Sequence, residues 1–273
     1  MSRPRVLTAC LWAGYLFLYA PIALVVLYSF NRNALVTVWG GWSLRWYGRL
    51  LSDRAILDAA WLSLRVASVS ASLAVVLGTM AGVALARHGR FRGRGLLSGL
   101  VVAPMVMPEV IIGLASLLLF VSLGVGRGFW TIVIAHVSFT TSVASVVVRA
   151  RLAGFDRSLE EAAQDLGAAP LRVFLDVTLP LIGPAVVAGW LLAFTLSVDQ
   201  LVISSFVSGP QATTLPMIVY SKVRLGLTPD VNALATLIVA AVGAVTLCAG
   251  IVAGRGGRRH AKPEALPPDS VQG

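Results

Sequence analysis

Six long apolar segments constrain the fold of this chain more than any other feature of its sequence. A helix needs about 20 apolar residues to cross the hydrocarbon core of a bilayer. Charged residues make up only 12% of the chain, whereas soluble domains carry about 25%. The sequence therefore predicts an all-α, polytopic membrane protein with six transmembrane helices, in a domain over residues 1–254 that is followed by a disordered tail over 255–273. The predicted spans are Val6–Phe30, Trp61–Ala86, Leu96–Leu123, Phe129–Val148, Leu181–Phe206 and Leu234–Gly254.

The basic residues predict the orientation of these spans. Cytoplasmic loops and termini of membrane proteins carry an excess of Lys and Arg. Of the 22 Lys and Arg residues, 14 lie on the side that holds both termini and the loop over residues 151–180, 7 lie on the other side, and Arg65 lies within a span. We therefore expect cytoplasmic N and C termini, with lipid headgroups rather than nucleic acid as the partner of the basic charge. The 14 residues are Arg3, Arg5, Arg87, Arg90, Arg92, Arg94, Arg149, Arg151, Arg157, Arg172, Arg255, Arg258, Arg259 and Lys262.

The predicted outer segment Asn31–Ile56 is rich in aromatic residues. Trp and Tyr side chains gather at the headgroup depth of a bilayer, and this is one interpretation of Trp39, Trp42, Trp46 and Tyr47. Contact with a partner outside the membrane is the other interpretation.

The stretch Ser158–Pro180 is the longest polar interruption on the predicted cytoplasmic side. A serine followed three residues later by Glu161 fits a capping box, which predicts a helix that begins at Leu159. Gly167 then suits a turn that needs positive φ, and a proline three residues further on suits the start of a second short helix. We therefore expect a helix, a turn and a second short helix that rest on a membrane face. The apolar stripe of the first helix comprises Leu159, Ala162, Ala163 and Leu166.

The residue spacing in this stretch resembles the EAA loop of ABC importer permeases. That family pattern is E-A-A, three spaces, G, nine spaces and I-x-L-P, and the chain matches it from Glu161 to Pro180 with Val177 in place of isoleucine. The resemblance implies a helix that docks into a groove on a cytoplasmic ATPase. A solvated amphipathic connector is the alternative, and Glu161 could serve only to cap its own helix. The implied ATPase-coupling residues are Glu161, Ala162, Ala163, Leu166, Gly167, Leu179 and Pro180.

An acidic residue follows a proline within the third predicted span. Pro104 and Pro108 remove backbone donors and are expected to break this helix. Glu109 then falls in the first turn after the break, where the positive end of the following helix favours a carboxylate. Two interpretations stay open, namely a self-capped kink and a carboxylate that faces a hydrated path.

The fifth predicted span contains a second acid, Asp199. An Asp at the centre of a membrane helix costs about 2.5–3.5 kcal/mol, so such residues usually face the interior and have a role. We expect either a hydrogen bond between helices or an anionic site for a cationic solute. In the second case Glu109 and Asp199 would each balance an ammonium group, Phe194 would add cation–π attraction, and Gln200 would lie next to the site. His136 in the fourth span is expected to be hydrogen-bonded to a neighbour, with a direct role in solute binding as the alternative.

Further stretches across all six spans are similar to the polyamine branch of ABC importer permeases. The resemblance implies a type I importer permease fold in the bacterial inner membrane that moves a polyamine, with putrescine the first candidate, by alternating access. It also implies a homologous second permease as heterodimer partner, two cytoplasmic ATPase subunits that hydrolyse ATP with Mg²⁺, and a periplasmic substrate-binding protein. Departures from the family pattern are a single acid at Asp199-Gln200 and Glu109 in place of Asp. The stretches are Leu18–Pro21, Tyr28–Asn31, Ala103–Val110, Phe194–Asp199, Ser205–Pro210, Thr214–Pro216 and Val231–Thr236.

Other classes of function find less support in the sequence. No segment fits the phosphate-binding pattern G-x-x-x-x-G-K-[ST], so we expect that the chain binds no cofactor and that a partner supplies the energy. His88, His136 and His260 are scattered, which predicts no catalytic or metal site and argues against a membrane enzyme. The remaining alternatives are the same machinery with another small solute, such as an iron complex or thiamine, and a proton-coupled secondary transporter that uses Asp199 and Glu109.

Overall fold

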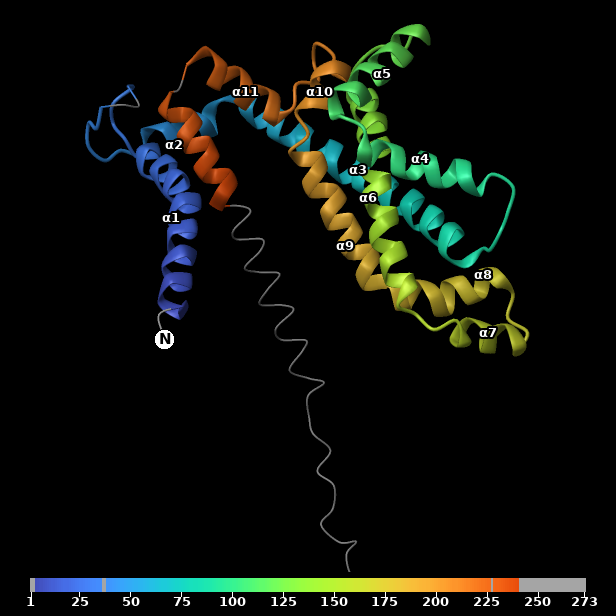
Figure 1. Cartoon of the computed structure of the whole chain (residues 1–273). Helices are drawn as coiled ribbons and strands as arrows, with labels where there is room; N and C mark the ends of the chain where they lie inside the picture. The colour runs from blue at the N-terminus through green and yellow to red at the C-terminus, as the bar shows by residue number, and fades with distance from the viewer. Residues whose placement is uncertain (1–2, 36–37, 227, 241–273) are drawn as a thin grey trace, which may run out of the picture. The chain divides into compact units, whose positions relative to one another are not determined.

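The computed structural model describes residues 3–35, 38–226 and 228–240, which are mostly helical. The only strand-like pairing within these ranges is an isolated antiparallel bridge between Asn31 and Trp42. The chain divides into two compact units, one from Met1–Ser52 with Lys222–Gly273 and one from Asp53–Ser221. The predicted all-α fold is therefore confirmed. Figure 1 labels the helices along the chain.

Three packed helices form the core of the Asp53–Ser221 unit. They are α3 (Arg54–Arg87), α6 (Phe129–Ala153) and α9 (Leu179–Val198), which lie side by side in Figure 1. Small residues bring α3 and α6 close together, because a Cβ added at Gly78 would lie 2.7 Å from the Ala144 Cβ and 2.9 Å from the Ser145 backbone nitrogen. Membrane helices commonly pack through such small residues.

This close approach predicts a large effect of a side chain at Gly78. In Gly78→Leu, the added atoms would meet the α6 backbone, which cannot yield as a flexible side chain does, so we expect a loss of about 3 kcal/mol in stability. The measurement is the thermal unfolding midpoint of the purified protein in detergent. Gly99→Leu in α4 is the matched control, because nothing lies within 4 Å of its added Cβ. Equal midpoints for the two variants would contradict this account of the α3–α6 interface.

The third predicted span is bent sharply. It comprises α4 (Arg94–Val106) and α5 (Glu109–Ser122), whose axes differ by 116°. Pro104 lies inside α4, so only the second proline breaks the helix, and the expectation for the first was wrong. Met107 has ψ of 141°, as expected of a residue that precedes proline. Glu109 occupies the first turn of α5, as predicted.

The fifth predicted span begins and ends earlier than expected. Its helix runs without interruption from Pro170 to Val198, through α8 (Pro170–Val173), a π-helical turn (Phe174–Thr178) and α9. The second helix thus begins at Pro170 as predicted, but it continues into α9 instead of ending as a short helix. A wider turn just before Pro180 fits a residue that has no N–H to offer the preceding turn. After a break at residues 199–201, α10 (Val202–Val207) follows, so the predicted end at Phe206 was also wrong.

The other unit contains α1 (Arg3–Ser29), α2 (Arg45–Ser52) and a helix over Pro229–Ala240. The helix α11 (Leu215–Leu225) leads into it, and its Lys222 Nζ lies 2.8 Å from Asp230 Oδ2. In the predicted outer segment, Trp46 is buried and donates from Nε1 to the Asn31 carbonyl oxygen at 2.7 Å. Trp42, in contrast, is 68% exposed, so both interpretations of the aromatic segment stay open for it.

The described helices agree with several spans without fixing their number. Four of them are long and apolar enough to cross a membrane, or five if the bent α4–α5 pair is one span. The sixth predicted span, Leu234–Gly254, lies outside the described residues after Ala240, as does the tail over 255–273. Six spans, the domain boundary at residue 254 and cytoplasmic termini therefore stay predictions.

Candidate functional site

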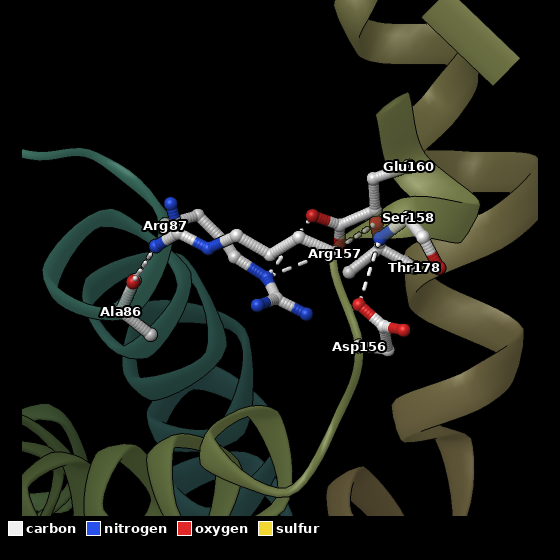
Figure 2. Close-up of polar contacts among 7 residues, drawn as sticks. All are labelled: Ala86, Arg87, Asp156, Arg157, Ser158, Glu160 and Thr178. Atoms are coloured by element: carbon white, nitrogen blue, oxygen red, sulfur yellow. Dashed lines mark hydrogen bonds and ion pairs between the residues drawn. The ribbon is translucent and has the colours of Figure 1, made fainter. Parts of the chain in front are cut away.

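A single carboxylate, that of Glu160, holds the short helix α7 (Ser158–Asp165) against the core. It accepts a hydrogen bond from Arg87 Nε at 3.1 Å and another from Thr178 Oγ1 at 2.9 Å. The side chains of Arg87 and Glu160 are only 12% and 15% exposed, so this ion pair is largely shielded from water. Because Arg87 ends α3 and Thr178 lies in the π-helical turn, Glu160 ties three segments together (Figure 2).

The segment just before α7 adds two further contacts. Arg157 donates from Nη2 to the Ala86 carbonyl oxygen at 2.9 Å, so Arg87 and Arg157 reach in opposite directions between α3 and the start of α7. The Ser158 N–H donates to Asp156 Oδ1 at 3.1 Å. This N–H and the Ser158 hydroxyl hold the pKa of the exposed Asp156 carboxyl below its usual value.

The predicted capping box is wrong. Ser158 is the first residue of α7 rather than its cap. Arg157 occupies the cap position, and its side chain makes no capping hydrogen bond. Ser158 instead donates its backbone N–H to Asp156 Oδ1, which lies before the helix. Glu161 is exposed, and within the described ranges its side chain makes no hydrogen bond or ion pair. The capping interpretation of Glu161 is thus not supported.

The apolar stripe of α7 faces outward. Leu159 and Leu166 are 51% and 89% exposed, Ala162 is exposed and Ala163 is half-buried. Glu160 lies on the inner face of the helix, and the predicted contact of the stripe with a membrane face stays a prediction. The structure therefore presents an apolar helix surface that no described part of the chain covers.

The remaining coupling residues form the turn after α7 and the start of α9. Gly167 has φ of +85°, and its N–H donates to the Gln164 carbonyl oxygen at 2.8 Å, which confirms the predicted turn. Leu179 packs against a buried cluster that includes Leu152 and Ile182. Pro180 is exposed in the first turn of α9.

Sequence reasoning did not identify Glu160 or Arg87 as site residues. The E-A-A spacing selects Glu161, which is one position away and points elsewhere. One signal was available, since Thr178 falls on the apolar stripe of the following helix, where a buried hydroxyl needs a polar partner. Glu160 supplies that partner.

The two acids predicted for the solute path are exposed and separate. Asp199 follows the last residue of α9, and Glu109 is the first residue of α5. Neither side chain makes a hydrogen bond or ion pair with any residue that the structure describes. The structure does not bring them into contact with one another, and no described residue supports the interpretation of Asp199 as a hydrogen bond between helices. Their part in a solute path stays a prediction.

The other predicted path residues differ in their surroundings. The Phe194 ring is stacked on Trp190, with centroids 5.2 Å apart and an interplanar angle of 12°. Trp190 in turn donates from Nε1 to Ser72 Oγ at 3.1 Å, which links α9 to α3. Gln200 is only 6% exposed, so it lies in the packed interior rather than on an open surface.

His136 bridges the break between α9 and α10. It is 1% exposed, its Nδ1 lies 2.7 Å from Ser197 Oγ, and its Nε2 lies 2.9 Å from Ser204 Oγ. The predicted hydrogen bond to a neighbour is therefore confirmed. Since both ring nitrogens are occupied by serines, the alternative of direct solute binding is not supported.

Sequence comparison places the chain among known transport proteins. Residues 74–260 match the family described as "Binding-protein-dependent transport system inner membrane component". The chain belongs to this family, and it is thus a membrane subunit of a transport system that works with a binding protein. The match favours the importer interpretation over a self-sufficient secondary transporter. It also supports the inner membrane as the location.

The chain is similar to two relatives whose names identify them as transport permeases. The "Putrescine transport system permease protein PotI" of Escherichia coli strain K12 is 58% identical over 238 residues, which cover 85% of each chain. The "Spermidine/putrescine transport system permease protein PotC" of Haemophilus influenzae is 41% identical over 239 residues, 88% of this chain and 93% of that protein. These relatives are transport permeases rather than enzymes.

Solved structures support the same fold at low sequence identity. A chain of a bacterial ABC transporter involved in import of the acidic polysaccharide alginate has a TM-score of 0.72 at 19% identity, over 96% of this chain and 98% of that chain. A chain of the MetNI methionine ABC transporter has a TM-score of 0.62 at 20% identity, over 74% of this chain and 95% of that chain. The fold is thus that of ABC importer membrane subunits.

Proposed function

We propose that this chain is the permease subunit of an ATP-driven importer that moves a polyamine, with putrescine as the first candidate, by alternating access. The observation that carries the proposal is α7, a short helix anchored by Glu160 that leaves its apolar stripe exposed. A helix fixed to the core and apolar on its outer face suits docking into a groove of another protein. A cytoplasmic ATPase is the partner that this arrangement supports best.

The proposed motion follows from the connections of α7. A displacement of this helix would act on α3 through Arg87 and on the π-helical turn through Thr178. The turn is continuous with α9 up to Val198, so a push at the predicted cytoplasmic end would reach Asp199 directly. ATP-driven closure of two ATPase subunits would thereby pivot the permease between inward-open and outward-open states.

The proposed cargo rests on charge and on the named relatives. Polyamines carry ammonium groups, and Asp199 and Glu109 are exposed carboxylates without partners among the described residues. The stacked rings of Trp190 and Phe194 lie on α9, which ends directly before Asp199, and they offer aromatic faces to a cation. PotI and PotC carry putrescine and spermidine/putrescine in their names. A cation is therefore favoured over an iron complex as the solute.

The proposed partners follow from the class of protein. They are a homologous second permease, two ATPase subunits that bind ATP and Mg²⁺, and a periplasmic protein that delivers the solute. A related alginate transporter has been solved in complex with a periplasmic protein, at a TM-score of 0.65 and 16% identity. The proposal of a separate ATPase is supported by the sequence, in which no segment fits G-x-x-x-x-G-K-[ST].

The decisive experiment is ATPase activity of the reconstituted complex. We expect stimulation by the binding protein when it is loaded with putrescine, and less with spermidine. Gly167→Asp and Glu161→Lys should abolish this stimulation, because the first strains a turn with positive φ and the second reverses a charge on the docking helix. Uptake by this chain alone, driven by a proton gradient with no ATPase bound, would overturn the proposal in favour of a secondary transporter.

A further inference from the structure

A cavity of about 560 Å³ lies beside the Glu160 contacts, at the ends of α3 and α6. Three arginines line it, namely Arg87, Arg149 and Arg157. The rest of its lining is apolar and includes Val146, Ala150 and Phe155. Val146 is 38% exposed and Ala150 is exposed, so the apolar wall continues to the outside of α6.

The positive charge in this cavity is not balanced by the residues that the structure describes. Glu160 meets Arg87 through Nε, but Arg87 Nη2 is buried and has no hydrogen-bond partner. Arg157 donates to a neutral carbonyl, and Arg149 makes no hydrogen bond or ion pair with a described residue. The neighbouring Asp156 is exposed and accepts from Ser158. Three arginines therefore gather at this cavity, and Glu160 is the one carboxylate among the described residues that meets any of them.

We propose that this cavity binds the phosphate group of an acidic phospholipid. Guanidinium groups pair with phosphate through parallel hydrogen bonds. Basic pockets between membrane helices bind lipid headgroups on the cytoplasmic side, which is the side that the Lys and Arg distribution assigns to this cavity. The apolar wall of Val146, Ala150 and Phe155 suits the first acyl carbons of a lipid, whereas free phosphate has no apolar part that could contact it.

The position of the cavity allows a bound lipid to affect the attachment of α7 to the core. Arg87 and Arg157 line it and also hold α7 to the end of α3. A phosphate between these arginines reduces the repulsion between their charges. Acidic lipid therefore stabilises the contact through which α7 is attached to the core.

The test uses the full-length protein purified in detergent, with native mass spectrometry to count retained lipids and thermal unfolding to measure stability. Retained lipid and stability are measured after addition of phosphatidylglycerol and are compared with the values after addition of phosphatidylcholine. Inorganic phosphate is added in a separate experiment. We expect wild-type protein to retain one phosphatidylglycerol and to gain stability from it. Arg149→Gln should bind it about tenfold more weakly, because a charge-assisted hydrogen bond is lost.

Two control variants keep the outcome interpretable. Arg172→Gln removes an exposed arginine of α8 that does not line the cavity, and it should bind lipid like the wild type. Arg149→Lys keeps the charge and should retain part of the affinity even if Arg149→Gln does not fold. The proposal is overturned if wild-type protein retains no phosphatidylglycerol, if Arg149→Gln and Arg172→Gln weaken binding equally, or if inorganic phosphate stabilises the protein as well as the lipid does.

Discussion

Glu160→Ala should uncouple ATP hydrolysis from transport. The substitution removes the acceptor that joins α7 to Arg87 and Thr178, and it leaves Arg87 as a largely buried charge without a carboxylate. Breaking a buried pair in this way costs up to about 3–5 kcal/mol, and the partial exposure of these side chains points to the lower end. We expect uptake to fall at least about tenfold, which corresponds to about 1.4 kcal/mol. The measurement is solute uptake per ATP hydrolysed in proteoliposomes.

The same variant should still bind its ATPase, because the outward face of α7 is unchanged. Co-purification of the ATPase therefore separates lost coupling from lost assembly. Asp165→Ala is the matched control, since it removes an exposed carboxylate from the same helix and should leave the coupling ratio unaltered. A normal coupling ratio in Glu160→Ala would show that α7 transmits motion without this contact.

Asp199→Asn should reduce uptake to background while the complex still assembles. Asn has nearly the same shape as Asp but no charge, and Asp199 is exposed with no described partner that its loss would leave unpaired. A cationic solute would then lose its counter-charge at the end of α9. Uptake of radiolabelled putrescine measures the effect, and size-exclusion chromatography of the complex measures assembly.

Another exposed acid of the same unit provides the comparison. Asp58→Asn makes the same chemical change in α3, at a residue with no described contact. It should leave uptake unchanged. If Asp199→Asn imports putrescine as well as Asp58→Asn does, the carboxylate of Asp199 has no part in the solute path.

Much of the fold could be predicted because long apolar segments allow few structures. With no water to satisfy backbone groups, a membrane segment of this length must be helical, and the positions of α3, α6 and α9 followed from hydropathy. The helix ends were harder, because they depend on local backbone chemistry. Hydropathy alone could not show that Pro104 is accommodated in α4 while Pro108 breaks the chain, or that α9 stops at Val198.

The candidate site was predictable in position but not in detail. Spacing located α7 and the turn at Gly167, and both are present. It could not show which way α7 faces, since that depends on Arg87, which lies 73 positions before Glu160 in the sequence. An ion pair between residues so far apart leaves no periodic signal in either segment. Similarly, nothing near Gln200 in the sequence shows that it is buried.

The π-helical turn over Phe174–Thr178 fixes an angular relationship between two parts of the chain. Each residue of an α-helix advances by about 100° around the axis, and a π-helical turn holds one residue more than an α-helical turn. The five residues of this turn wind through about the same angle as four residues of a regular α-helix, so α8 and α9 keep nearly the orientation that an uninterrupted helix one residue shorter would give them. A pattern of apolar residues read at 3.6 residues per turn therefore goes out of step by one residue at Phe174–Thr178. The extra residue thus shifts the sequence register between the two helices without changing the direction of the chain.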